Sequence, residues 1–285
     1  MARRWPGGDV PLSERLLVIA GQALPGVPLD GARVTGGEFH DVVLLPGVAA
    51  VRVARNAAAA ATLPRSAALL DRLADVLPFP VPRPLGPVTE AGGTSALAVS
   101  WVDGAPHPRG TGDPERLGAL LAALAAVDVA PLRPLLGPPY LHPGCWTDVV
   151  EDGVLPLLPA RWHAEVRRRT EAVLALPPVP PSLVHCDLVG PNVHWLPSGA
   201  LAGVLDWDFA QEFDPALDAA CLGRWHGWDV LRAVVDDATW RRARIWADSF
   251  GIEHVGSALL NGEPPAVVDH HVSGTIEWLE RTCHP

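Results

Sequence analysis

Three oxygen-bearing side chains each follow a short apolar run in the middle of this 285-residue chain. Asp187 comes first, Asn192 lies five positions later, and Asp206 ends a second apolar run. A carboxylate can orient a hydroxyl nucleophile, while an amide oxygen and a second carboxylate can hold magnesium against nucleotide phosphates. The spacing therefore predicts phosphoryl transfer, with Asp187 as the catalytic group and Asn192 and Asp206 as metal ligands. The alternative is that all three merely cap turns, as Asp and Asn often do.

The motifs around these residues resemble those of the aminoglycoside phosphotransferase family, which comprises small-molecule kinases built like protein kinases. The chain reads HCDLVGPN at 185–192, LDW at 205–207 and DPALD at 214–218, where the family usually has HGDxxxxN, IDW and DPxxD. Three linked motifs in this order are far more specific than any one alone. The resemblance implies that His185, Asp214 and Asp218 support the catalytic loop. Cys186 replaces the usual glycine, and a backbone angle suited only to glycine would be strained there.

A glycine pair and a basic strand residue mark the expected phosphate contacts. Gly36 and Gly37 separate two predicted strands, and small residues there would let backbone amides approach phosphates. An ordinary hairpin is the alternative. Arg52 stands where the family has a phosphate-binding Lys or Arg, and a guanidinium can grip two phosphate oxygens. Lys is absent from the sequence, so all 22 basic residues are Arg; Arg55 is the second candidate for this role.

One departure concerns the helix expected over about 56–76. A kinase normally places a Glu there to pair with the basic strand residue, whereas this chain has Ser66 near that position. The departure leaves open how Arg52 is held. The resemblance further implies a hinge where backbone groups of Ser100 and Val102 meet the nucleotide base. The amino-terminal lobe resembles that of the viomycin and capreomycin phosphotransferases of the family.

The resemblance implies an α+β, bilobal, protein-kinase-like fold. Residues 1–102 are expected to form a nucleotide-binding lobe with a five-stranded antiparallel sheet, and residues 103–285 a mostly helical lobe for catalysis and substrate binding. Apolar spacing and caps predict helices from residue 114, over about 159–176, and over about 237–250, 252–261 and 265–282. The triplet Arg167–Arg169 is interpreted as a solvated helix face rather than a phosphate site.

Composition narrows the class of protein. The net charge of −10 argues against nucleic acid as a partner, because nucleic-acid binding needs a basic surface. The longest apolar run near the start, Leu16–Ala20, is too short for a signal peptide or a membrane span. The four cysteines show no paired spacing, which gives no sign of a disulfide framework or zinc site. A cytoplasmic protein without a membrane partner is expected.

These observations favour an ATP- or GTP-dependent O-phosphotransferase with Mg²⁺ as cofactor. The acidic charge suits a small cationic hydroxylated acceptor, and the family favours an antibiotic of the tuberactinomycin or aminoglycoside type. Alternatives are a metabolite kinase on the same fold, or a nucleotide-binding pseudokinase, which the missing Glu and Lys would suit. Acids that could contact the substrate are Asp208, Glu253, Asp269 and Glu277.

Overall fold

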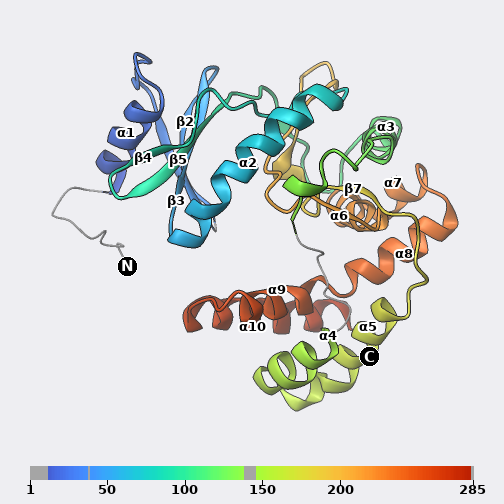
Figure 1. The fold of residues 1–285 in the computed structure, drawn as a ribbon. Coiled ribbons are helices and arrows are strands. Elements are labelled where there is room, and N and C mark those ends of the chain that lie inside the picture. The colour runs from blue at the N-terminus through green and yellow to red at the C-terminus, as the bar shows by residue number, and fades with distance from the viewer. Residues whose placement is uncertain (1–11, 38, 138–145, 284–285) are drawn as a thin grey trace. The chain divides into compact units, whose positions relative to one another are not determined.

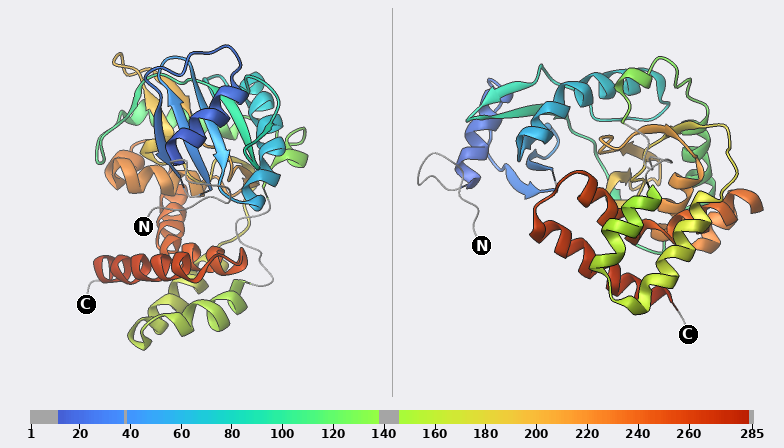
Figure 2. Two further views of the ribbon diagram at one scale, coloured as in Figure 1. Left: turned by 90° about the vertical axis from the view of Figure 1, so that its left-hand side faces the viewer. Right: turned by 60° about the horizontal axis from the view of Figure 1, so that its bottom comes forward.

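The computed structural model describes residues 12–37, 39–137 and 146–283 (Figures 1 and 2). The chain forms two compact units, and both are discontinuous in sequence. The sheet unit comprises residues 1–108, 126–136 and 189–210, and the helical unit comprises residues 109–125, 137–188 and 211–285. Asn192 and Asp206 therefore belong to the sheet unit, whereas Asp187 belongs to the helical unit. The simple division at residue 102 remains a prediction.

A five-stranded antiparallel sheet forms the centre of the sheet unit, as predicted. Its spatial order is β1-β2-β3-β5-β4. Helix α1 packs Leu16, Ile19 and Ala20 against the sheet residues Val43 and Val51, which together form a buried apolar core. The elements are β1 (Arg33–Gly36), β2 (His40–Leu45), β3 (Ala49–Ala54), β4 (Thr89–Ala91), β5 (Thr94–Ser100) and α1 (Leu12–Ala23).

Helix α2 (Ala57–Val76) contacts strands β3 and β5 of this sheet (Figure 1). Its first turn is capped by Asn56, whose side chain accepts a hydrogen bond from the Ala59 amide at 2.8 Å. Pro64 lies inside the helix without ending it. Because the face with Leu63, Ser66 and Leu70 is buried, tertiary packing outweighs the lost backbone hydrogen bond.

Two of the predicted site residues, Asn192 and Asp206, flank a smaller three-stranded sheet in the same unit. Its order is β6 (Ala105–Pro106), β8 (Val193–Trp195) and β9 (Leu201–Val204). A 3₁₀ turn, η5 (Gly190–Asn192), leads into β8. The Leu205 amide, directly after β9, donates to the Asn192 carbonyl at 2.8 Å. This bond ties the segment ending at Asn192 to the segment that continues into Asp206. The short 3₁₀ turn η1 (Arg133–Leu135) also belongs to this unit.

The helical unit is built around a short two-stranded ribbon and a set of helices. Strand β7 (Ser182–Val184) pairs antiparallel with β10 (Gln211–Phe213). The helices are α3 (Pro114–Ala125), α4 (Trp146–Asp148), α5 (His163–Leu174), α6 (Ala216–His226), α7 (Trp228–Arg232), α8 (Asp237–Ala247), α9 (Phe250–Leu260) and α10 (Pro265–Thr282), with the shorter turns η2 (Val149–Val154), η3 (Leu155–Leu157) and η4 (Ala160–Trp162).

The closing helices match the predicted pattern, with ends that differ by a few residues. Helices α9 and α10 run side by side (Figure 1). Gly251 permits this approach, because a Cβ atom there would overlap the Trp278 ring. Within the described parts of the chain, the model contains no helix whose length and apolar character would allow it to cross a membrane.

Candidate phosphotransfer site

The loop carrying Asp187 is held by a buried carboxylate from the first turn of α6. Asp218 accepts hydrogen bonds from the backbone amides of His185 and Cys186, at 2.8 and 2.9 Å. The Asp187 amide in turn donates to Nδ1 of His185 at 3.2 Å. Burial raises the pKa of Asp218 to about 7, although the two amide donors favour its charged form. The side chains of Asp218 and His185 thus fix the backbone from His185 to Asp187.

Cys186 occupies a left-handed backbone conformation, with φ of 67°. The strain expected from replacing glycine is therefore present, since side chains with a Cβ atom disfavour this region. Asp206 is the other described non-glycine residue with positive φ, at 57°. Burial raises the pKa of the Cys186 thiol well above its usual value, which makes it a poor nucleophile. Both left-handed residues are next to, or part of, the predicted site.

Asp214 holds a different element from Asp218. Its buried carboxylate accepts hydrogen bonds from Arg242 Nε at 2.5 Å and from Trp246 Nε1 at 2.6 Å, both on α8. It also caps α6 by accepting from the Ala216 amide at 3.0 Å. The family resemblance implies that the two acids of the DPALD motif brace the catalytic loop together. Their hydrogen bonds instead give them separate roles, because Asp218 holds the loop whereas Asp214 fastens α8 to α6.

The predicted metal ligands offer hard oxygen donors on tied backbone segments. The Asp206 side chain is 50% exposed, so its carboxylate can be reached from solvent. Among the described residues, no group of three or more His, Cys, Asp or Glu is arranged to hold a metal. Mg²⁺ does not need such a cage, because it usually binds one or two protein carboxylates together with substrate phosphates and water. Asn192 and Asp206 fit that ion, and their role as its ligands remains a prediction.

Arg52 forms the most connected ion pair of the sheet unit. Its guanidinium binds Asp208 with two nitrogens: Nη1 lies 3.1 Å from Oδ1, and Nη2 contacts Oδ2. Nη2 also lies 3.6 Å from Asp206 Oδ1. Burial opposes the charged guanidinium, but the two carboxylates outweigh it, so the pKa of Arg52 is raised. Burial alone would raise the pKa of Asp208, but the charge and hydrogen bonds of Arg52, together with the hydrogen bond from Ser66, outweigh it, so this pKa is lowered.

The contact of Ser66 with Asp208 shows how Arg52 is held without the helix glutamate of kinases. Its hydroxyl, buried on α2, donates to Asp208 Oδ1 at 3.0 Å. The carboxylate that partners Arg52 thus comes from the loop after β9, and the residue at the glutamate position orients that carboxylate. Asp208 was a candidate for substrate contact; its carboxylate is engaged by Arg52 and Ser66. The one sequence signal for this arrangement is the serine itself.

His40 belongs to the same cluster and was not predicted. Its Nδ1 lies 3.1 Å from Arg52 Nη2, and arginine can only donate, so Nδ1 carries no proton. Burial, followed by the charge of Arg52, lowers the pKa of His40 to about 4. With His40 neutral, one guanidinium faces two carboxylates, which favours an added cation. The β2–β3 register pairs Val42 with Arg52; His40, two residues away, therefore shares its face.

Arg55, the second candidate for the phosphates, is used by the glycine hairpin instead. Its Nε donates to Asp41 at 2.8 Å, and its Nη1 donates to the Gly37 carbonyl. A Cβ atom on Gly36 would lie 2.6 Å from the Arg55 guanidinium, so a larger residue there would displace that side chain. The Gly37 amide donates to the His40 carbonyl at 2.8 Å. Phosphate contact by Gly36 and Gly37 remains a prediction.

The expected hinge residues lie at the end of β5. The Ser100 amide donates to the Arg83 carbonyl at 2.7 Å, and the Ser100 hydroxyl accepts from the Arg83 amide at 2.9 Å. These two groups are thereby occupied within the sheet unit. Val102 is buried. A nucleotide contact through the remaining backbone groups of Ser100 and Val102 stays a prediction.

Comparison with known proteins agrees with this geometry. Residues 32–250 match the model of the phosphotransferase enzyme family, APH. The chain belongs to this family. It is 31% identical over 273 residues to viomycin phosphotransferase of Streptomyces vinaceus, a match that covers 86% of this chain and 93% of that protein. The chain is accordingly a phosphotransferase with an alcohol group as acceptor, which sets aside the pseudokinase alternative.

Solved structures confirm the predicted fold. The GDP complex of wild-type aminoglycoside 2'-phosphotransferase-IIIa superposes with a TM-score of 0.79 at 19% identity, covering 95% of this chain and 98% of that one. Macrolide 2'-phosphotransferase type I gives a TM-score of 0.70 at 20% identity, covering 93% and 98% of the two chains. The kinase-like fold is thus shared with enzymes named for quite different antibiotics.

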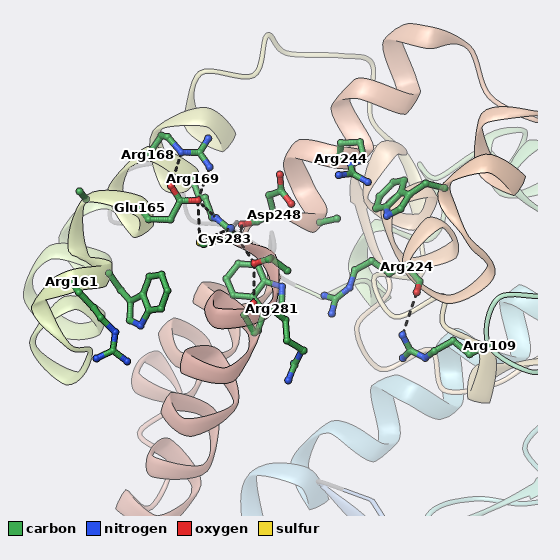
Figure 3. Close-up of a pocket in the computed structure, with 16 residues that line it drawn as sticks. Arg109, Arg161, Glu165, Arg168, Arg169, Arg224, Arg244, Asp248, Arg281 and Cys283 are labelled. Atoms are coloured by element: carbon green, nitrogen blue, oxygen red, sulfur yellow. Dashed lines mark hydrogen bonds and ion pairs between the residues drawn. The ribbon is translucent and has the colours of Figure 1, made fainter. Parts of the chain in front are cut away.

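The predicted substrate-contacting acids of the helical unit do not gather around its large cavity. Glu253 is buried and accepts a hydrogen bond from the Ser249 hydroxyl. Asp269 and Glu277 are exposed on α10, and Glu277 lies 3.5 Å from Arg281. The cavity of about 1180 Å³ in this unit is lined by seven arginines and by none of these three acids (Figure 3). A substrate role for the three acids remains a prediction.

Proposed function

We propose that this phosphotransferase moves the γ-phosphate of ATP or GTP to a hydroxyl of a viomycin-class, amine-rich antibiotic. The observation that carries the proposal is the 31% identity to viomycin phosphotransferase along nearly its whole length. A purine nucleotide as donor is supported by the structural relative that was solved as a GDP complex. The net charge of −10 also favours the approach of a cationic acceptor.

Asp187 is assigned the catalytic role. Its carboxylate would orient the acceptor hydroxyl and take its proton as the phosphate is transferred. The backbone bonds from His185 and Cys186 to Asp218 support this role, because they fix the loop without using the Asp187 carboxylate. A group that must meet a reacting hydroxyl gains from being positioned in advance.

Asn192 and Asp206 would hold Mg²⁺, which would neutralise charge on the nucleotide phosphates when bound. Arg52 would contact the same phosphates. The two hydrogen bonds from Arg52 to Asp208 fix the direction of the guanidinium in advance. Contacts with Ser66 and His40 limit how far this ion pair can rotate. Gly36 and Gly37 would cover the phosphates, and backbone groups at Ser100 and Val102 would meet the base.

The test is an acceptor panel measured by release of nucleoside diphosphate, with ATP and GTP tried separately. The panel contains viomycin, capreomycin, several aminoglycosides, a macrolide, choline and neutral sugars. We expect turnover with viomycin or capreomycin, and an acceptor KM that rises with salt as charge pairing is screened within a Debye length of about 8 Å. Turnover restricted to choline or sugars would instead identify a metabolite kinase. Turnover restricted to the macrolide, insensitive to salt, would contradict a cationic acceptor.

A further inference from the structure

The cavity of the helical unit concentrates positive charge in a chain that is acidic overall. Seven of the 22 arginines line it, against two carboxylates, Glu165 and Asp248. The arginines come from the segment before α3 and from η4, α5, α6, α8 and α10, so the chain brings them together from six places (Figure 3). We call this cavity the arginine pocket. Like charges gathered in one cavity repel, which favours occupation by an anion.

Three of the seven arginines are engaged by carboxylates at one end of the pocket. Arg168 and Arg169 both bind Glu165, with closest distances of 2.6 and 2.7 Å. Arg169 is buried; it also donates to the Thr282 hydroxyl at 3.0 Å and stacks on the Trp278 ring. Arg161 pairs with Glu280 at 3.1 Å. Arg169 thus ties α5 to the end of α10, Arg161 ties η4 to α10, and Arg168 is paired within α5, so all three have a structural role.

Three further arginines of the pocket, Arg109, Arg244 and Arg281, are neutralised less completely. Within the described parts of the chain, Arg109 and Arg244 make no ion pair with a carboxylate; they lie over the rings of Trp225 and Trp228, each 4.5 Å from the ring centroid. Arg281 has only an exposed pair with Glu277 at 3.5 Å, an interaction of little strength in water. Figure 3 shows Arg224, Arg244 and Arg281 arriving from three different helices around the pocket.

We propose that the arginine pocket binds a phosphate ester of small-molecule size. A guanidinium offers paired donors that match phosphate oxygens. A phosphate monoester carries close to two charges and three acceptor oxygens, so it can reach arginines from several helices, whereas one carboxylate has a single charge and two oxygens. The volume of about 1180 Å³ leaves room for an organic group, and Trp162, Trp228 and Trp278 give the wall flat apolar surfaces.

This pocket is separate from the residues assigned to phosphoryl transfer. None of Asp187, Asn192, Asp206 or Arg52 lines it. Its charge would repel the amines of a cationic acceptor. The inference therefore goes beyond the proposed function, and a binding measurement without turnover tests it whichever acceptor the enzyme uses.

Isothermal titration of the full chain with phenyl phosphate tests the proposal, with benzoate and benzyl alcohol as analogues of lower charge. Each titration is run with and without saturating ADP. The variants are Arg244→Gln and Arg224→Gln. Arg241→Gln is the matched control, because Arg241 lies on the same helix as Arg244, is highly exposed and does not line the pocket. Thermal unfolding without ligand checks that each variant is folded.

We expect one phenyl phosphate per chain, bound equally well with ADP present. Loss of one charge-assisted contact should weaken binding about tenfold or more in Arg244→Gln and Arg224→Gln, and by less than about twofold in Arg241→Gln. Binding that ADP displaces would place the ligand at the nucleotide site and overturn the proposal. Equal loss in Arg241→Gln, equal affinity for benzoate, or no binding at millimolar concentration would also overturn it.

Discussion

The two units position their important carboxylates by different means. In the sheet unit, the Asp208 carboxylate is held by the Arg52 guanidinium and the Ser66 hydroxyl, so the negative charge of Asp208 contributes to holding its own side chain in place. In the helical unit, the loop of Asp187 is held by the backbone amides of His185 and Cys186, which bond to Asp218, and these two bonds do not involve the Asp187 carboxylate. Removing a negative charge should therefore disturb structure in the first case and chemistry in the second.

The largest effect is expected from Asp187→Asn. The amide keeps the shape of the side chain but cannot accept the hydroxyl proton, and such groups contribute roughly 100- to 10,000-fold to kcat. Because the bonds of Asp218 to the amides of His185 and Cys186 are kept in this variant, the unfolding temperature and the nucleotide affinity should stay close to those of the wild type. Asp229→Asn, a change at an exposed position on α7, is the matched control. More than about a tenth of wild-type kcat in Asp187→Asn would remove Asp187 from its assigned role.

Asp208→Asn should lower both activity and stability. Losing a charge-assisted contact costs about 1.5–3 kcal/mol, so the nucleotide KM should rise roughly ten- to a hundredfold. The melting temperature should fall as well, since Arg52 is left without its main partner in a site where only 13% of its side chain is exposed. Steady-state kinetics and thermal unfolding of the same preparations measure the two effects.

A carboxylate swap sharpens this prediction. Ser66→Glu alone would place a second carboxylate beside Asp208, so it should be damaging. Ser66→Glu combined with Asp208→Asn restores one carboxylate to Arg52 from the helix, as in the kinase arrangement, and should recover part of the nucleotide affinity. A double variant no better than Asp208→Asn would show that Ser66 does not lie in the place of the kinase glutamate.

The sequence predicted features that depend on local spacing. The motifs at 185–192 and 214–218, which Asp218 joins by its bonds to the catalytic loop, could be recognised by their resemblance to a known family. The same resemblance implied the five-stranded sheet. The partner of Arg52 could not be predicted, because Asp208 lies 156 positions away. The arginine pocket could not be predicted either, because its arginines come from six separate segments of the chain. Arg169, expected on a solvated face, is buried because its charge meets Glu165 and its plane stacks on Trp278.

A smaller effect concerns Glu165, which is held by two guanidinium groups of the helical unit. The pKa of Glu165 is lowered to about 2, chiefly by hydrogen bonding to Arg168. Burial partly opposes this lowering, and hydrogen bonding to Arg169 adds to it. Because the pKa of Glu165 is lower in the folded state than its ordinary value of 4.5, the charged carboxylate stabilises the fold fully at pH values above 4.5. This stabilisation is lost as the pH falls from 4.5 toward 2. Glu165→Gln should thus cost about 1 kcal/mol at neutral pH and less in acid.

Urea unfolding of wild type and Glu165→Gln between pH 3 and pH 7 measures this difference. Glu277→Gln is the control, because Glu277 makes only an exposed pair. A difference between Glu165→Gln and wild type that stays constant over this range would show that the carboxylate charge does not stabilise the helical unit.

The smallest effect separates backbone strain from side-chain packing at Cys186. At φ of 67° a residue with a Cβ atom is strained by about 1–2 kcal/mol, whereas glycine gives up about 0.5–1 kcal/mol through greater freedom in the unfolded chain. Cys186→Gly should therefore change stability by at most about 1.5 kcal/mol. Cys186→Ala keeps the Cβ atom and loses the thiol, so Cys186→Gly should be the more stable of the two by urea unfolding. If Cys186→Ala were the more stable, the left-handed backbone would not be strained, and the amide bonds to Asp218 alone would account for the loop geometry.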